Sequence, residues 1–250
     1  MSPQLAGVAA VAFDVNGTLV HIRTDEHRDD IFRTIGHYLT YQGIDLRRHQ
    51  VRDLYFERLK AQQRASPEQY PEFDAVAIFR SIVDDFATDY TRSLPQGRLD
   101  ELPVTLAELF RGVSRTKLKL YPHVRTMLEA LRGRYPLAIV TDAQSAYARG
   151  ELHKVGITQY FGPVVVSGDH GFRKPDPRLF EYAIEGLGVP AEQTVYVGND
   201  MFRDIFGARE VGMRTVMFDS DQGTKHHGDC APDFRITHHR ELLELLGVPS

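Results

Sequence analysis

The stretch that decides the fold is Val8-Ala-Ala-Val-Ala-Phe-Asp-Val-Asn-Gly-Thr18, in which an apolar run passes directly into a turn rich in polar residues. The first six residues carry no charge, and an unbroken apolar run of this length is typical of a strand buried on both faces of a parallel sheet. Asp14, Asn16, Gly17 and Thr18 follow within five positions. The stretch therefore predicts a buried strand that ends in a polar loop.

Four more apolar runs of strand length occur later in the chain, and amphipathic helical patterns lie between them. The runs are residues 137–140, 164–166, 194–197 and 215–218. The clearest helical pattern is preceded by Asp176 as a suitable N-cap, begins with Pro177 and stops at Gly188. Alternation of strands and helices predicts a doubly wound α/β domain with a parallel sheet.

Residues 21–116 interrupt this alternation, because they show only helical periodicity and no strand pattern. Four apolar stripes lie in this region, so we expect a helical cap domain of four helices at 21–116. The α/β core domain would then consist of residues 1–20 and 117–250. Ligands of open α/β sheets bind beyond the carboxyl ends of the strands, and an insertion that leaves from this edge is placed to act as a lid.

Side chains that can act as nucleophiles, metal ligands or phosphate-binding groups follow four of the expected strands. They are Asp14 to Thr18, Thr141 with Asp142, Lys174, and Asp200 with Asp204. The carboxyl ends of parallel strands meet at one edge of a sheet, and carboxylates gathered there repel one another unless a cation joins them. Mg²⁺ is the simplest such cation, since it takes one or two carboxylates together with phosphate oxygens and waters. The ammonium of Lys174 could hold and orient a nucleophilic carboxylate.

In this order and after these strands, the clusters resemble the four signature motifs of the haloacid dehalogenase (HAD) superfamily of hydrolases. Asp14 with Gly17 and Thr18 matches the first motif, and Thr141 matches the second. Lys174 matches the third, and Asp200 with Asp204 matches the fourth. The resemblance covers essentially the whole chain and includes the branch with a helical cap after the first strand. It implies a Rossmann-like sheet, dependence on Mg²⁺ and hydrolysis of phosphate monoesters through an aspartyl-phosphate.

The resemblance also assigns roles to individual residues. Asp14 would attack phosphorus, Thr141 would hydrogen-bond a phosphoryl oxygen, and Lys174 would offset the crowded negative charge. Asp200 and Asp204 would hold the metal together with Asp14 and the backbone carbonyl of Asn16. The residues expected to contact substrate are Gly17, Thr18, Thr141, Asp142 and Lys174.

Asn16 departs from the pattern of the family's phosphatases. These usually carry a second Asp two residues after the nucleophile, which protonates the leaving alcohol and then activates water. An amide does not exchange a proton near neutral pH. General acid–base catalysis contributes roughly 10²–10⁴-fold to rate, so hydrolysis of ordinary alkyl phosphates is expected to be slow.

Four interpretations of Asn16 remain open. The substrate could have a good leaving group, such as an acyl phosphate, or the reaction could be dehalogenation of a 2-haloacid, which needs no protonation. Another group, such as His21 or a cap residue, could supply the proton. The protein could also be a weakly active or inactivated phosphate-binding regulatory protein. The paired acids at 200 and 204 favour a metal and a phosphoryl substrate, because dehalogenation of this type needs no metal.

Composition narrows the class of partner. The net charge of −4 over 250 residues lacks the basic excess of proteins that bind nucleic acid or anionic membranes. The longest uncharged apolar run, residues 5–13, is too short for a membrane helix. Cys230 is the single cysteine, which rules out an internal disulfide and fits the reducing cytoplasm. We expect a cytoplasmic enzyme that acts on a small phosphorylated metabolite; the sequence leaves the substrate's identity and the oligomeric state open.

Overall fold

The computed structural model describes residues 4–249, so the first three residues of the predicted core lie outside it. A six-stranded parallel sheet with the order β5-β4-β1-β6-β7-β8 forms the centre of the fold. The strands are β1 (Ala10–Phe13), β4 (Leu137–Thr141), β5 (Val164–Val166), β6 (Thr194–Gly198), β7 (Arg214–Phe218) and β8 (Phe234–Ile236). This confirms the Rossmann-like α/β fold. Strand order reverses beside β1, which is where such sheets form a ligand crevice.

Side chains of β1 alternate between the two faces of the sheet, as the pleat of a strand requires. Val11 and Phe13 join an apolar cluster with α6 (Val124–Leu131) and α10 (Arg240–Leu246). Ala12 instead joins a cluster with α8 (Pro177–Leu187) and α9 (Gly207–Glu210). The sheet is therefore covered on both faces, which explains why its strands are apolar throughout.

The ends of α8 lie where the sequence predicts them. The Asp176 side chain accepts a hydrogen bond from the backbone N–H of Arg178, and Pro177 is the first helical residue. Gly188 ends the helix in the left-handed conformation at φ +66°. The N-cap and C-cap predictions are confirmed. The N-cap at Asp176 fixes the start of α8 directly after the loop that carries Lys174.

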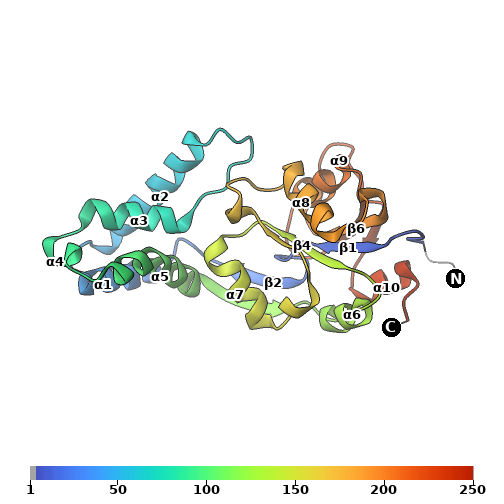
Figure 1. Ribbon diagram of the computed structural model, residues 1–250, viewed down its shortest axis with the longest axis horizontal. Helices are drawn as coiled ribbons and strands as arrows, with labels where there is room; N and C mark the ends of the chain where they lie inside the picture. The colour runs from blue at the N-terminus through green and yellow to red at the C-terminus, as the bar shows by residue number, and fades with distance from the viewer. Residues whose placement is uncertain (1–3, 250) are drawn as a thin grey trace.

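The helices between residues 29 and 114 form a separate layer with its own apolar core. They are α1 (Asp29–Tyr41), α2 (Arg48–Ala65), α3 (Ala75–Phe86), α4 (Asp89–Arg92) and α5 (Gln96–Ser114). Figure 1 shows these helices together at the left end of the molecule, with the six-stranded sheet to their right. The short α4 is additional to the four helices predicted from the apolar stripes. No helix in residues 4–249 has both the length and the apolar composition that crossing a membrane requires.

The expectation of no strand between residues 21 and 116 is wrong. Two strands, β2 (Val20–Thr24) and β3 (Arg115–Leu120), form an antiparallel pair between the sheet and the helices. Apolar Leu118 and Leu120 alternate with polar Lys117 and Lys119, which is the pattern of a strand with one buried face. The alternation is short, and helical periodicity on the adjacent residues hides it. Both chain connections to the helical layer, which we call the helical cap, run through this two-stranded ribbon.

We expect replacement of Phe180 by Ala to lower the free energy of unfolding by about 3–5 kcal/mol, because it empties a fully buried position in α8. The Phe180 ring packs edge-on against Tyr196, with ring centroids 5.1 Å apart, and closes over Gly207. Urea unfolding followed by circular dichroism measures the effect. Tyr182→Ala on the same helix removes a 40% exposed ring and is the control, with an expected loss below about 1 kcal/mol. Equal losses in the two variants would contradict this account of the core.

Candidate active site at the carboxyl edge of the sheet

A buried ammonium stands at the centre of the polar cluster. Lys174 is 3% exposed, and its Nζ donates to Asp14 Oδ1 over 2.8 Å and to Asp204 Oδ1 over 2.6 Å. The Val140 carbonyl and the Tyr196 hydroxyl oxygen each lie 3.2 Å from the same nitrogen. The loop after β5 thus brings one cation between carboxylates that follow β1 and β6.

Burial and charge act against each other in this group. Burial raises the pKa of Asp14 to about 6, although Lys174 works to lower it and Asp204 adds to the rise. Burial alone would lower the pKa of Lys174, but the adjacent Asp14 and Asp204 carboxylates raise it well above its ordinary value. Lys174 therefore stays charged, and Asp14 is ionised only above mildly acidic pH.

The second oxygen of Asp14 is held by the loop that follows β1. Thr18 Oγ1 lies 2.9 Å from Asp14 Oδ2 and 3.1 Å from Asn199 Oδ1, and its single proton is available to either acceptor. Gly17 has φ +90°, and a Cβ at this position would lie 2.3 Å from Asn199 Nδ2. Only glycine fits between the two loops, so the Gly17-Thr18 pair brings the β1 and β6 loops together.

The two predicted metal-binding aspartates of the fourth motif have different surroundings. Asp200 Oδ1 accepts from the backbone N–H groups of Phe202 and Arg203, and Oδ2 accepts from Thr224 N–H and the Arg203 guanidinium. Burial opposes its ionisation, but these donors lower the pKa of Asp200 to about 2. Its carboxylate is an N-cap with all of its acceptor positions in use. The metal role of Asp200 stays a prediction, and this geometry weighs against it.

Asp204 lies deeper, and its carboxylate bridges two loops. Oδ1 accepts from Lys174, while Oδ2 accepts from the backbone N–H groups of Asn199 and Asp200, each over 3.0 Å. This carboxylate anchors Lys174 to the turn after β6. The predicted metal role of Asp204 likewise stays untested.

Asn199 is the residue of this motif that faces the β1 loop, and sequence reasoning missed it as a site residue. It is 3% exposed, and its side-chain oxygen shares the Thr18 hydroxyl with Asp14. The available signal was position, because Asn199 directly follows Gly198, the last residue of β6. Charge drew attention to the next residue, Asp200, whose side chain turns toward the following helix.

The polar residues after β4 take two different positions. Thr141 is 2% exposed, and its Oγ1 is buried without a hydrogen-bond partner among residues 4–249. Asp142 Oδ1 accepts from the backbone N–H of Lys174, so this side chain holds the Lys174 loop. Burial also raises the pKa of Asp142. A buried hydroxyl without a partner is costly, and a phosphoryl oxygen at this edge would satisfy that of Thr141.

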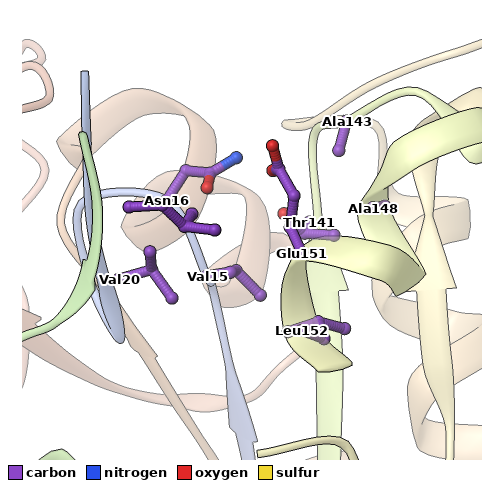
Figure 2. Close-up of a pocket in the computed structure, with 9 residues that line it drawn as sticks. Val15, Asn16, Val20, Thr141, Ala143, Ala148, Glu151 and Leu152 are labelled. Atoms are coloured by element: carbon purple, nitrogen blue, oxygen red, sulfur yellow. The ribbon is translucent and has the colours of Figure 1, made fainter. Parts of the chain in front are cut away.

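Asn16 faces a small cavity. The cavity has a volume of about 10 Å³ and lies between Asn16, Thr141, Ala143 and Glu151, among other residues. Figure 2 shows the Asn16 amide and the Glu151 carboxylate directed toward the same gap from opposite sides. His21, considered above as a proton donor, lies in β2 against Lys117, Tyr121 and Asp221 instead.

The oxygen atoms near Asp14 suit a hard cation. Within residues 4–249 no three His, Cys, Asp or Glu side chains converge to hold a metal ion. The Asp14 carboxylate and the Asn199 amide oxygen nevertheless both contact Thr18 Oγ1, and the Asn16 carbonyl belongs to the same loop. Mg²⁺ needs only one or two carboxylates when phosphate and water complete its shell. These donors therefore fit Mg²⁺, with a single charged ligand from the protein.

Comparison with known proteins identifies the family. Residues 8–212 match the family model of haloacid dehalogenase-like hydrolases, and the chain belongs to this family. Its curated relatives include phosphatases. A glyceraldehyde 3-phosphate phosphatase from Methanocaldococcus jannaschii is 28% identical to the chain, and the alignment covers 69% of this chain and 79% of that protein. A phosphoserine phosphatase from Thermus thermophilus is 36% identical, and the alignment covers 55% of each protein.

Among solved structures, the chain is similar to a 2-haloacid dehalogenase from Pseudomonas syringae. The TM-score is 0.68 with 22% identity, over 96% of this chain and 98% of that one. At this identity the likeness concerns the fold alone. The match to the HAD family confirms the resemblance that the motif residues suggested, and the chain is a HAD-like hydrolase.

We expect Lys174→Met to lower the free energy of unfolding by about 3–5 kcal/mol near neutral pH, because it leaves the Asp14 and Asp204 carboxylates without their buried counter-ion. Adding Asp14→Asn should recover part of this loss by removing one charge. Urea unfolding of the single and double variants measures both effects. Lys60→Met, at an exposed position of α2, is the control with little expected change. Equal stability of the two Met variants would show that the ion pair contributes nothing.

Proposed function

We propose that the protein is a Mg²⁺-dependent phosphatase that acts on a small phosphorylated metabolite through an aspartyl-phosphate on Asp14. The observation that carries the proposal is the buried Asp14–Lys174 pair together with the Thr141 hydroxyl, which has no hydrogen-bond partner in the described part of the chain. The phosphatase relatives support the same class of substrate. The cytoplasm suits such a substrate and the single cysteine.

The reaction requires a carboxylate that is held in place and kept ionised. Lys174 and Thr18 hold one oxygen of Asp14 each, so the carboxylate does not rotate. A bond forms between an Asp14 oxygen and phosphorus, and the ester bond to the leaving oxygen breaks. Water then attacks phosphorus, the bond to Asp14 breaks, and phosphate leaves with the Asp14 carboxylate regenerated. Thr141 donates to a phosphoryl oxygen, and Lys174 offsets charge that builds up between nucleophile and phosphate.

We assign metal binding to the Asp14 carboxylate, the Asn16 carbonyl and the Asn199 amide oxygen, in place of Asp200. Mg²⁺ at this position would offset phosphate charge and orient the phosphoryl group. The assignment rests on the contact of Thr18 with both Asp14 and Asn199, and on the occupied acceptor positions of Asp200. With one charged ligand, the site holds the ion tightly only when phosphate is present.

Asn16 determines which phosphates react well. The leaving oxygen receives no proton from this side chain, because an amide is not an acid near neutral pH. Acyl and aryl phosphates, whose leaving groups carry negative charge easily, should therefore be hydrolysed faster than alkyl phosphates. A binding protein with little turnover and a 2-haloacid dehalogenase are the alternatives, and the Asn16 variant and assays below separate them from a phosphatase.

We expect Asn16→Asp to raise kcat/KM for alkyl phosphates at least about 100-fold, since it supplies the missing general acid–base group. Rates with acyl phosphates should change much less. Phosphate release with Mg²⁺ and with a chelator measures both. The double variant Asp14→Asn/Asn16→Asp is the control and should be inactive. If Asn16→Asp stays inactive on every phosphate ester, the phosphatase proposal fails, and chloride release from 2-haloacids becomes the next assay.

The metal assignment makes a separate prediction. Asn199→Ala should weaken Mg²⁺ binding at least about tenfold, whereas Asp200→Asn should change it by less than about threefold and mainly lower stability. Titration calorimetry with Mg²⁺ in the presence of inorganic phosphate measures the affinity, and Asp14→Asn gives the baseline for a lost ligand. Loss of binding in Asp200→Asn with retention in Asn199→Ala would return the metal role to the predicted aspartate.

A further inference from the structure

A buried ion network joins the helical cap to the sheet beside the proposed active site. Arg111 in α5 donates to Glu151 in α7 (Ser145–Val155) through Nε over 2.7 Å and Nη2 over 2.9 Å. Arg115 in β3 donates to the same carboxylate over 2.9 Å. Arg111 and Glu151 are each 8% exposed. The Arg111 guanidinium also lies over the Tyr147 ring, 4.6 Å from its centre.

The position of Glu151 gives this network a possible chemical role. Glu151 and Asn16 line the same cavity, and Figure 2 shows the carboxylate and the amide directed into the gap between them. Asn16 follows the nucleophile Asp14 by two positions, so this gap lies beside the phosphoryl site. A leaving group directed toward Asn16 would enter this gap and meet Glu151.

The Glu151 carboxylate accepts three hydrogen bonds and has one acceptor position left for a substrate. Oε1 accepts from Arg111 Nε and Arg115 Nη1, which uses both of its lone pairs. Oε2 accepts one hydrogen bond, from Arg111 Nη2, and keeps one acceptor position. Both oxygens accept from guanidinium groups, so what this carboxylate offers a ligand is its remaining acceptor position.

We propose that Glu151 is a specificity-determining residue that accepts a hydrogen bond from a hydroxyl or ammonium group on the leaving part of the substrate. The preferred substrates are then phosphate monoesters with such a donor on a carbon near the ester oxygen. Esters with a purely apolar leaving group leave Glu151 Oε2 unsatisfied when the site closes, and this is costly for a buried charge. The inference rests on the proposed phosphatase function and names its substrate class.

The network also links this selection to the helical cap. Arg111 belongs to α5 and Arg115 to β3, whereas Glu151 belongs to the core. The two-point contact from Arg111 to Glu151 therefore forms only when the helical cap lies against α7. The cavity of about 10 Å³ beside Glu151 has room for about one water molecule in this structure.

The test compares glycerol 3-phosphate, which carries hydroxyl donors, with propyl phosphate, which has the same chain length and none. The unaltered protein should show a kcat/KM at least about tenfold higher for glycerol 3-phosphate, and where its alkyl phosphate rates are too low to measure, the comparison is made in the Asn16→Asp background. In Glu151→Gln, whose amide can turn its NH₂ group toward the substrate, this preference should fall below about threefold. Hydrolysis of 4-nitrophenyl phosphate, which has no donor, should stay within about threefold of its original rate.

Two further variants separate recognition from folding. Arg115→Gln keeps the two-point contact between Arg111 and Glu151 and should keep the preference for glycerol 3-phosphate. Glu151→Gln/Arg115→Gln removes one charge of each sign, so it folds if Glu151→Gln alone does not, and it should lose the preference. Circular dichroism and the midpoint of thermal unfolding verify folding of each variant.

Equal preference in the unaltered protein and in the two variants that lack Glu151 would overturn the inference, as would a lack of preference in the unaltered protein. Both results leave the phosphatase proposal intact, because 4-nitrophenyl phosphate is still hydrolysed. If the unaltered protein and Asn16→Asp hydrolyse none of the three esters, the proposed function fails, and the substrate class falls with it.

Discussion

One buried ammonium determines the arrangement of the whole polar edge of the sheet. Lys174 Nζ contacts carboxylates from the loops after β1 and β6 and the carbonyl of Val140 in β4. Without this cation, Asp14 and Asp204 would be buried charges of one sign, and the loops that carry them would separate or the groups would take up protons. The order of the strands matters for the same reason, because β1 lies between β4 and β6 and brings all three contributions within reach of one side chain.

The sequence predicts the sheet well because burial on both faces leaves an unambiguous apolar run in each central strand. β8 and the β2–β3 ribbon were not found, since β8 is three residues long and the ribbon alternates polar and apolar residues beside strong helical patterns. In the site, charge identified Asp14 and Lys174 as partners across 160 positions of sequence. Charge also placed emphasis on Asp200, while the neutral Asn199 faces the β1 loop. Side-chain direction in a tight turn depends on backbone geometry that residue types alone do not reveal.

The site carries amides at two positions near the nucleophile, Asn16 in the β1 loop and Asn199 after β6. Both offer oxygen atoms to a ligand without adding negative charge or a transferable proton. This lowers repulsion around Asp14, whose pKa burial already raises to about 6. A less negative pocket binds an anionic phosphate more readily, but an amide at position 16 cannot transfer a proton to the leaving oxygen. The balance suits substrates that leave without help, and it makes contacts to the leaving group, such as that of Glu151, more important for selection.

The β2–β3 ribbon has a consequence for how the helical cap could be exchanged during evolution. Val20 pairs with Leu120 and Thr24 with Arg115, so the chain leaves the core and returns to it at neighbouring points. To the core, the intervening helices are equivalent to a long hairpin loop, and the entropy of closing a loop grows only slowly with its length. A different insert can therefore start from the same two strands without disturbing the sheet. The ribbon is a fixed attachment point, so the same α/β core can carry different inserted domains that contact different substrates.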